Sequence, residues 1–383
     1  MKNQIKKLIR YRDYYYNRFL RFFINVFNVF PVKNNRIFFY SFNGKQYSDN
    51  PRVISEALLL DKEDFEIVWA FNKPQNYRSI LPQSFKSVRY GSLLCCYYAK
   101  TSKVQVFNSR SDGRIARRNN QIYIQTWHAS NGYKKLNPSK GVDSLQNKLT
   151  CADYSYVMCG SSMMEKERAR GTMNFSGPII KGTPRMDSII KGVPDYYKKL
   201  ICDYYKLPLD LRIALYAPTY RSRKESDYGL DYKNIVEQLK LKYGGSWILL
   251  VRLHYFVEKR ISSSPDYIDA TSYPDIQDLL MASDVLISDY SSCIWDFSFL
   301  NRPCFLFCPD LRQYSSSVNF NIPIKDWGFP IATTMEELRN NIECFDSKEY
   351  NARIIKHHND MGSYEDGCAT KRVCDIIKNF IKA

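Results

Sequence analysis

The stretch Ile287-Ser-Asp-Tyr-Ser-Ser-Cys-Ile-Trp-Asp-Phe297 continues a short apolar run that begins at Asp284. The apolar run predicts a buried strand, and the residues after it begin a helical pattern. Ser291 and Ser292 therefore lie at a turn from a strand into a helix. Free backbone N–H groups at a helix start, together with two hydroxyl groups, favour a bound phosphate. The alternative interpretation is that Ser291 only caps the helix.

The same alternation of short apolar strands and helical segments extends on both sides of this stretch. We expect strands at Ile37–Phe42, Glu66–Phe71, Val104–Phe107, Ile122–Trp127, Tyr154–Cys159, Ile213–Ala217, Trp247–Leu253, Val285–Ser288 and Pro303–Phe307. We expect helices at Asn50–Leu60, Pro194–Tyr205, Tyr232–Leu241, Asp275–Ala282 and Ser292–Leu300. Such alternation is typical of parallel β-α-β winding. The sequence thus predicts an α/β protein with two Rossmann-like halves that face a cleft.

The chain divides into three parts. Residues 1–35 form a basic segment, residues 36–180 a first α/β domain, and residues 181–383 a second α/β domain with C-terminal helices. We place the domain boundary near Lys181. One of the helices after Met335 is a candidate to cross back and brace the two halves.

Composition limits the classes of function. The 383 residues are enough for two domains, and 44% hydrophobic with 25% charged residues indicates a globular chain. A net charge of +17 points to an anionic partner: nucleic acid, a membrane surface or a phosphorylated substrate. The 11 cysteines include no Cys-x-x-Cys pair and there are four histidines, so we expect neither disulfides nor a zinc site. Most cysteines are interpreted as small buried hydrophobes.

The N-terminal segment carries eight Lys or Arg residues against the single Asp13, with aromatic residues at helical spacing. Phe19–Val32 is too short and too polar to cross a bilayer, which needs about 20 apolar residues. No signal peptide is evident. We therefore expect a basic amphipathic helix that lies on the anionic cytoplasmic face of a membrane. The alternative is a helix that packs on its own domain.

Two of the four histidines end predicted strands. His128 follows the strand Ile122–Trp127, and imidazole is the side chain best suited to accept a proton from a hydroxyl near neutral pH. His254 follows a second strand and points to the same side as Arg252, so both can face a diphosphate. A structural histidine is the alternative at His128. His357 and His358 are interpreted as part of a solvated helix face.

Two further loops each follow an apolar strand and supply an arginine. They are Gly182–Asp187, with Arg185, and Tyr216–Arg221. Arginine suits bidentate contact with phosphate. Taken singly, each is an ordinary surface arginine; together with the other two strand ends, they indicate a phosphate-binding site.

With these motifs the chain resembles the CDP-glycerol glycerophosphotransferases that make wall teichoic acid and related polymers. The resemblance covers about residues 36–330. It rests on six ordered motifs, namely Ser41–Pro51, Gln125–His128, Gly182–Arg185, Tyr216–Arg221, Arg252–His254 and Ser288–Ser292 with Asp296, and it continues through Pro303 to Asp310–Tyr314. It implies a GT-B fold in which the C-terminal domain holds most of the nucleotide. It also implies transfer of an alcohol phosphate from a cytidine diphosphate alcohol to an acceptor hydroxyl, with release of CMP.

The resemblance assigns roles to individual residues. His128 would be the base on the acceptor hydroxyl, and His254 would stabilise charge on the donor diphosphate. The donor site would be lined by Arg185, Pro218, Thr219, Arg252, Leu253, Ser291, Ser292 and Asp296. In-line phosphoryl transfer needs mostly positioning and charge neutralisation, so we expect no metal and no cofactor.

One motif departs from the family. The family commonly has Trp-His-Gly-Thr-Pro-Leu-Lys where this chain has Trp127-His-Ala-Ser-Asn-Gly-Tyr-Lys134. The changed residues Ala129, Ser130, Asn131 and Gly132 would border the donor alcohol and the acceptor. Glycerol, ribitol and other CDP-linked alcohols therefore all stay open, with glycerol preferred.

The expected partners are CDP-glycerol or CDP-ribitol, a polyprenyl-diphosphate-linked saccharide acceptor and an anionic membrane surface, which makes the chain a peripheral protein of the cytoplasmic side of the cell membrane. One alternative is a nucleotide-sugar glycosyltransferase on the same fold. Another is a nucleic-acid or membrane-surface binding protein. We expect no nucleic acid, because the basic residues cluster at the N-terminus and at Arg110–Arg118 rather than in a known recognition module.

Overall fold

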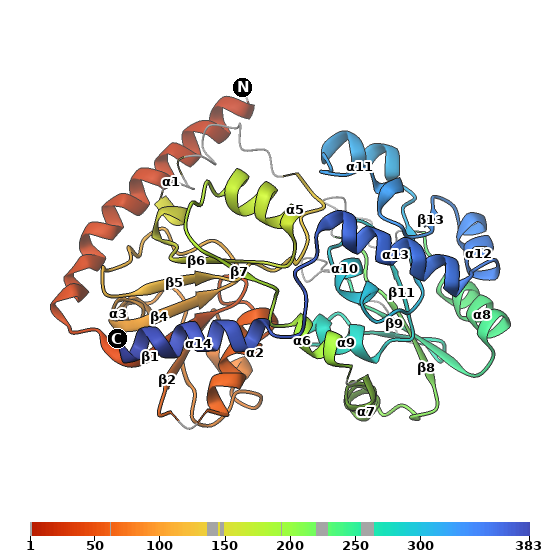
Figure 1. Ribbon diagram of the computed structural model, residues 1–383, viewed down its shortest axis with the longest axis horizontal. Coiled ribbons are helices and arrows are strands. Elements are labelled where there is room, and N and C mark those ends of the chain that lie inside the picture. The colour runs from red at the N-terminus through yellow and green to blue at the C-terminus, as the bar shows by residue number, and fades with distance from the viewer. Residues whose placement is uncertain are drawn as a thin grey trace. The chain divides into compact units, whose positions relative to one another are not determined.

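A computed structural model of the chain describes residues 2–61, 63–135, 145, 149–192, 194–219, 229–253 and 264–383. The chain forms two compact units, each built on one parallel sheet with helices against it (Figure 1). Unit 1 contains residues 1–130, 136–187 and 364–383, and unit 2 contains residues 131–135 and 188–363. The sequence analysis placed residues 364–383 in the second domain, whereas the structure places them in unit 1.

Unit 1 has a seven-stranded sheet in the order β3-β2-β1-β4-β5-β6-β7, and every strand pair is parallel. The strands are β1 (Lys33–Tyr40), β2 (Glu66–Phe71), β3 (Lys86–Arg89), β4 (Ser102–Phe107), β5 (Ile122–Gln125), β6 (Tyr156–Cys159) and β7 (Ile179–Lys181). The helical segments are α1 (Lys2–Ile24), η1 (Asn25–Val29), α2 (Asp49–Leu59), η2 (Pro74–Tyr77), α3 (Leu93–Thr101), η3 (Cys151–Asp153), α5 (Ser162–Met164), η4 (Glu165–Thr172) and α14 (Ala369–Lys382).

The central strand β1 is buried on both faces. Ile37 and Phe39 belong to a hydrophobic cluster that also contains side chains of α2 and α14. Phe38 and Tyr40, which point the opposite way, belong to a second cluster that contains side chains of α3. Burial on both faces explains why the strand has an unbroken apolar run instead of an alternating pattern. The contact of α14 with this core is also the reason that residues 364–383 belong to unit 1.

Unit 2 repeats the arrangement with six parallel strands in the order β10-β9-β8-β11-β12-β13. They are β8 (Arg212–Tyr216), β9 (Trp247–Val251), β10 (Tyr267–Asp269), β11 (Val285–Ser288), β12 (Cys304–Phe307) and β13 (Ile331–Ala332). The helical segments are α7 (Pro194–Tyr205), α8 (Tyr232–Tyr243), α9 (Ile276–Ala282), α10 (Cys293–Ser298), α11 (Leu311–Ser317), η5 (Ile324–Asp326), α12 (Met335–Glu343) and α13 (Ser347–Met361), while α6 (Met186–Lys191) runs from unit 1 into unit 2.

All nine expected strands are present, and the prediction of α/β architecture is confirmed. The strands that the sequence did not indicate are β3, β7, β10 and β13. Each lies at or near the edge of its sheet and has two to four residues, as in Lys86–Arg89, where only Val88 is buried. Such short segments contain too few apolar residues to show a period. The cysteines are all free and nine of them are buried, as their interpretation as small hydrophobes requires.

Both sheets reverse their strand order at one position, between β1 and β4 in unit 1 and between β8 and β11 in unit 2. At such a point the two neighbouring connections leave toward opposite faces of the sheet. The carboxyl ends of the two strands are then left uncovered, and ligands of doubly wound proteins bind there. We therefore expect a ligand site at the loops that follow β1, β4, β8 and β11.

The expectation that His357 and His358 face solvent is wrong. Helix α13 buries Tyr350, Ile354, His357 and Met361, which lie on one helical face. His357 is 2% exposed, and its Nε2 lies 2.8 Å from the hydroxyl of Tyr133. Nε2 of His358 lies 2.7 Å from Oγ of Ser298. Charged residues lie between the buried positions of α13, so the apolar face was not recognised in the sequence. The contacts of Tyr133 also explain why residues 131–135 belong to unit 2.

These histidines predict acid sensitivity. Burial lowers the pKa of His357 to about 4, because the imidazolium loses its hydration. The unfolded chain binds this proton near pH 6.5, so the free energy of unfolding should fall as the pH drops from 6.5 toward 4. Between pH 7 and 5 this histidine alone should cost about 2 kcal/mol. We expect urea unfolding of His357→Gln, which keeps an acceptor for Tyr133, to show a smaller acid loss than the parent chain. Equal losses would contradict this account.

Candidate functional site

The loops at the reversal point of unit 1 are fastened to each other. The backbone N–H of Phe42, after β1, donates to Oδ1 of Asn108, after β4, at 2.8 Å. Phe42, Asn43 and Gly44 all have positive φ angles, of 47°, 55° and 80°. A Cβ atom on Gly44 would come within 2.8 Å of Cβ of Tyr90, so this tight curl requires glycine. Strained backbone of this kind is found preferentially at functional sites.

His128 lies beside this loop, three residues after the end of β5. Its Nδ1 is 2.9 Å from the carbonyl oxygen of Asn108. A carbonyl oxygen only accepts hydrogen bonds, so Nδ1 carries the proton and Nε2 keeps a lone pair. The imidazole stacks on Trp127, with ring centroids 4.6 Å apart. The side chain is half-buried, and its free nitrogen is the one that can accept a proton.

The surroundings keep His128 neutral. Burial lowers the pKa of its imidazole to about 4, and the positive charges of Arg185 and Arg168 lower it further, while the hydrogen bond to Asn108 acts in the opposite direction. At neutral pH the ring is therefore unprotonated. A neutral imidazole with one fixed nitrogen has the form that a general base needs.

Arg185 is engaged inside unit 1. It is 4% exposed, and its guanidinium lies 3.1 Å from Oδ1 of Asp49 and 2.9 Å from Oγ of Ser130. Its backbone N–H donates to Asn50, whose side-chain amide in turn donates to the carbonyl of Trp127 at 3.1 Å. Arg185 thus holds the loop that carries His128. The expected contact of Arg185 with the donor stays a prediction.

The reversal point of unit 2 is fastened in a similar way. The hydroxyl of Thr219 donates to Oδ1 of Asp289 at 2.6 Å, and its backbone N–H donates to the same carboxylate at 2.9 Å. The hydroxyl of Ser288 donates to the carbonyl of Ala217 at 2.7 Å. Pro218 is buried between these contacts. The loops after β8 and β11 therefore present Thr219 and the serine turn at one edge of the sheet.

Ser291 and Ser292 lie at the start of a helix, as the capping interpretation predicts. Ser292 is the residue before α10, and Oγ of Ser291 accepts a bond from the N–H of Cys293 at 3.4 Å. Asp296 is buried, and its carboxylate accepts from Nε2 of Gln277 at 2.7 Å. Both serines are half-buried. Capping and phosphate binding use the same N–H groups and are compatible.

Arg252 and Leu253 follow β9. Nη1 of Arg252 donates to the carbonyl of Tyr273 at 2.5 Å, and burial lowers the pKa of its guanidinium. The N–H of Leu253 donates to Thr271 at 3.0 Å. His254 lies outside the described residues, as does Arg221. The expected role of His254 at the donor diphosphate therefore stays a prediction.

The structure distributes the expected residues over both units. His128, Ala129, Ser130 and Arg185 lie together in unit 1, and Asn131 and Gly132 belong to unit 2, where the carbonyl of Gly132 accepts from Asn321 at 2.5 Å. The sequence analysis missed Asn108 and Asn50, which fix the ring of His128 and its loop. A polar residue directly after an apolar strand was the available signal for Asn108. Within the described ranges, no three His, Cys, Asp or Glu side chains are grouped so as to hold a metal ion.

Comparison with known proteins places this geometry in context. A family model described as CDP-Glycerol:Poly(glycerophosphate) glycerophosphotransferase matches residues 21–379. The teichoic acid glycerol-phosphate transferase of Staphylococcus aureus is 29% identical, with 98% of this chain and 99% of the relative covered. The teichoic acid poly(glycerol phosphate) polymerase of Staphylococcus epidermidis is 28% identical over 92% of this chain, and the chain spans 51% of that relative.

A solved structure of the wall teichoic acid polymerase TagF is similar to the whole chain. The TM-score is 0.84 at 25% sequence identity, and the similarity covers 100% of this chain and 98% of that one. The expectation of a GT-B-type fold is thereby confirmed.

The buried pair of Arg185 and Asp49 yields a prediction about stability. Arg185→Met removes the guanidinium that faces the Asp49 carboxylate inside unit 1. Breaking a buried pair by removing one partner costs about 3–5 kcal/mol. Denaturant unfolding should show this loss, whereas Arg353→Met, which breaks an exposed pair with Glu349, should cost under about 1 kcal/mol. Similar losses in the two variants would contradict a positioning role for Arg185.

Proposed function

Because the chain belongs to the CDP-glycerol:poly(glycerophosphate) glycerophosphotransferase family, we propose that it transfers an alditol phosphate from a CDP-alcohol to a hydroxyl of a lipid-linked saccharide or growing polymer. Glycerol phosphate is the preferred group, and CMP is the second product. The polymer is a teichoic acid or a similar cell-surface polymer. The observation that carries the proposal is the neutral imidazole of His128, whose tautomer is fixed by the carbonyl of Asn108.

The proposed reaction is a single displacement at phosphorus. The acceptor hydroxyl oxygen attacks the phosphorus that carries the alcohol, and the bond from this phosphorus to the oxygen of CMP breaks. The hydroxyl proton passes to Nε2 of His128. Two features support this role: the ring is neutral at pH 7, and its other nitrogen is held at 2.9 Å by Asn108. Positioning and charge neutralisation supply most of the catalysis in such a transfer.

The donor is proposed to bind to unit 2. Thr219, Arg252, Ser291 and Ser292 follow three strands around the reversal point, where doubly wound sheets bind their ligands. The charge of Arg252 and the N–H groups at the start of α10 suit the diphosphate. His254 and Arg221 are proposed to complete this site on the basis of their motifs. A TagF variant with a substituted histidine was solved after a soak with CDPG, which is consistent with a CDP-alcohol donor in the family.

Removal of the base tests the proposal. We expect His128→Ala to reduce CMP release from CDP-glycerol by about 10²–10⁴-fold, the usual effect of losing a general base. His357→Gln, in the core of unit 2, should keep the parent rate at pH 7.5. Product formation would be followed by mass spectrometry with CDP-glycerol, CDP-ribitol and UDP-sugars in parallel.

Two results would overturn the assignment. An unchanged rate in His128→Ala would remove His128 from the chemistry. Release of UDP without release of CMP would identify a nucleotide-sugar glycosyltransferase instead.

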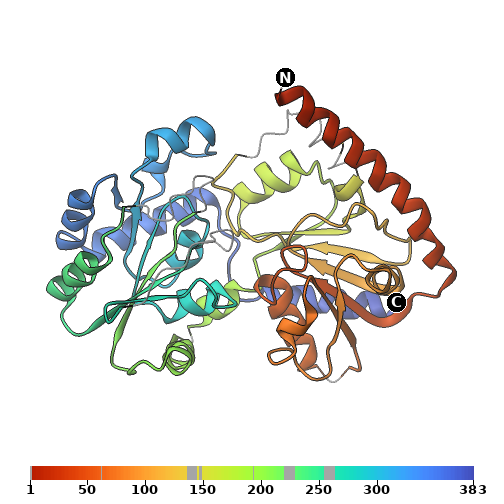
Figure 2. The same ribbon diagram turned by 180° about the vertical axis from the view of Figure 1, so that it is seen from behind.

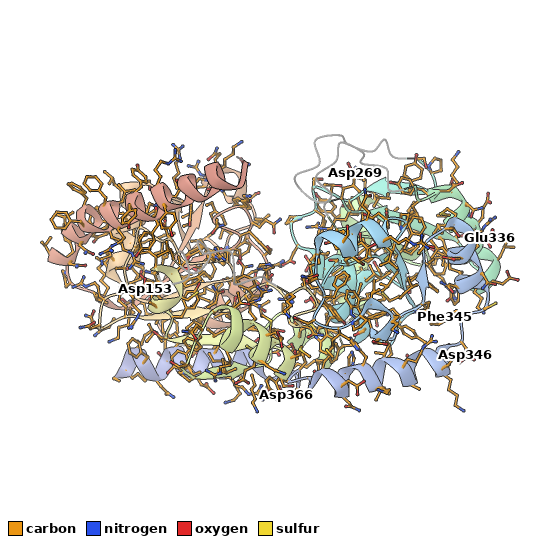
Figure 3. All side chains as sticks on the ribbon, turned by 90° about the horizontal axis from the view of Figure 1, so that it is seen from above. Asp153, Asp269, Glu336, Phe345, Asp346 and Asp366 are labelled. Carbon is orange, nitrogen blue, oxygen red and sulfur yellow. The ribbon has the colours of Figure 1, made fainter. Side chains whose placement is uncertain are left out.

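The acceptor is proposed to be a polyprenyl-diphosphate-linked saccharide, reached from the membrane surface. Helix α1 and the segment η1 have two different faces. Leu20, Ile24 and Phe27 pack against the core of unit 1, and Arg21 pairs with Asp153 at 2.6 Å (Asp153 is labelled in Figure 3). Figure 2 shows α1 along one side of unit 1. Arg21 is thus an internal anchor of the helix.

The opposite face is aromatic and exposed. Its side chains are Tyr15, Tyr16, Phe19, Phe22, Phe23, Val26, Val29 and Phe30, with exposed fractions from 44% to 76%. Apolar surface of this extent on one helix is typical of an interaction site. No helix within the described residues is long and apolar enough to cross a bilayer. We propose that this face lies on an anionic membrane from the cytoplasmic side, assisted by exposed arginines such as Arg12 and Arg18.

The membrane proposal predicts which side chains matter. Replacement of Phe19, Phe22 and Phe23 by Ser should move the protein from the pellet to the supernatant when it is spun with phosphatidylglycerol vesicles. Leu241→Ser with Ile355→Ser, two exposed apolar residues of unit 2, is the control and should still pellet. Added salt should weaken binding by the parent chain. Pelleting of the triple variant would place the docking surface elsewhere.

A further inference from the structure

One buried cation of unit 1 has no role in the reaction described above. Arg168 lies on η4, a π-helical segment, and is 7% exposed. Its Nε and Nη1 atoms have no hydrogen-bond partner among the residues that the structure describes. The nearby Arg170 differs, since it pairs with Glu165 at 3.1 Å and donates to the carbonyls of Phe175 and Gly177.

Arg168 and the proposed base contact the same ring. Its Cζ is 4.7 Å from the centre of the Trp127 ring, and the same ring stacks on His128. Trp127 has a φ angle of 51°, a strained value for a bulky residue, and its carbonyl is held by Asn50. The structure therefore maintains a costly backbone conformation at the residue that contacts both the guanidinium and the imidazole. Single π-helical turns are frequent at functional sites, which agrees with this position.

The buried charge of Arg168 destabilises the folded chain. Burying a charged group without a partner destabilises a folded chain, because the lost hydration is not replaced. Burial together with the positive charge of Arg110 lowers the pKa of Arg168 to about 10, so the guanidinium stays protonated at neutral pH. Stacking on Trp127 recovers only part of this cost. An anion bound to the guanidinium would remove the deficit.

We propose that Arg168, supported by the ring of Trp127, binds a phosphate group of the acceptor beside His128. The inference rests on the proposed function and identifies the acceptor as a phosphate-bearing molecule. A planar guanidinium with unused N–H groups suits a phosphate better than a neutral sugar. The acceptor is chosen as the source because Arg168 and the proposed base lie in the same unit, while Thr219, Arg252, Ser291 and Ser292 of the proposed donor site lie in unit 2. Acceptor binding would also offset the positive charge that disfavours protonation of His128.

Kinetics with each substrate varied in turn test the inference. Arg168→Met should raise the KM of the acceptor by about 10- to 100-fold, the effect of losing a hydrogen bond to a charged group, and leave the KM of CDP-glycerol within about twofold. Arg168→Lys should recover part of the loss. Lys166→Gln, an exposed charge change on the same helical segment, is the matched control and should behave as the parent chain.

Two acceptors distinguish the source of the phosphate. A disaccharide on a lipid diphosphate carries only the linker phosphates, whereas a soluble oligomer of glycerol phosphate carries only phosphodiesters. An increase of KM in Arg168→Met with either acceptor supports the proposal and identifies the group. An increase confined to the KM of CDP-glycerol, or no increase with either acceptor, overturns it.

Two measurements do not need turnover. Thermal unfolding of Arg168→Met should be unchanged or shifted upward, because an unpaired buried charge is removed; a marked downward shift with no change in ligand binding would show that the residue is structural. Calorimetric titration with sn-glycerol 3-phosphate, in saturating CMP to fill the donor site, should show at least about tenfold weaker binding to Arg168→Met. Equal binding overturns the inference. If the parent chain releases no CMP but shows this difference, the proposed function fails and the phosphate site stands.

Discussion

The reversal of strand order, between β1 and β4 in unit 1 and between β8 and β11 in unit 2, is the constraint on which the rest of the structure depends. It leaves the carboxyl ends of two central strands uncovered in each unit. The polar groups of the loops there must then satisfy one another. Asn108 with Phe42 does this in unit 1, and Asp289 with Thr219 does it in unit 2. In unit 1 the residue that closes the loops also orients the candidate site, because the backbone carbonyl of Asn108 holds Nδ1 of His128.

Two buried arginines of unit 1, Arg185 and Arg168, differ in their partners. Arg185 faces Asp49 across 3.1 Å, and its backbone N–H donates to Asn50, which holds the loop of His128. Arg168, in contrast, has unused N–H groups within the described part of the chain and stands over Trp127. Both guanidinium groups lower the pKa of His128 and keep the ring able to accept a proton. These three side chains, His128, Arg185 and Arg168, are the basis of the acceptor site proposed above.

The N-terminal helix α1 has one face that packs on unit 1 and one that is exposed. Arg21 anchors it to Asp153, and Ile24 enters the core, so the helix belongs to unit 1. Five of its aromatic residues, between Tyr15 and Phe23, are nevertheless exposed, the reverse of an ordinary amphipathic helix on a globular domain. The alternative that the helix packs on its own domain is confirmed for one face. The membrane contact of the exposed face stays a proposal.

The sequence by itself determined the α/β class, nine of the strands, the family and the place of His128 at a strand end. These are properties of contiguous residues: an apolar run, a cap or a motif with fixed spacing carries its own signal. Only the tertiary structure decided that Asn108 fixes the tautomer of His128, that Arg185 faces Asp49, and that His357 is buried against Tyr133. It also decided that residues 364–383 complete the core of unit 1. Each of these contacts joins residues far apart in the chain, or depends on which helix face meets a core, and no local period records such a pairing.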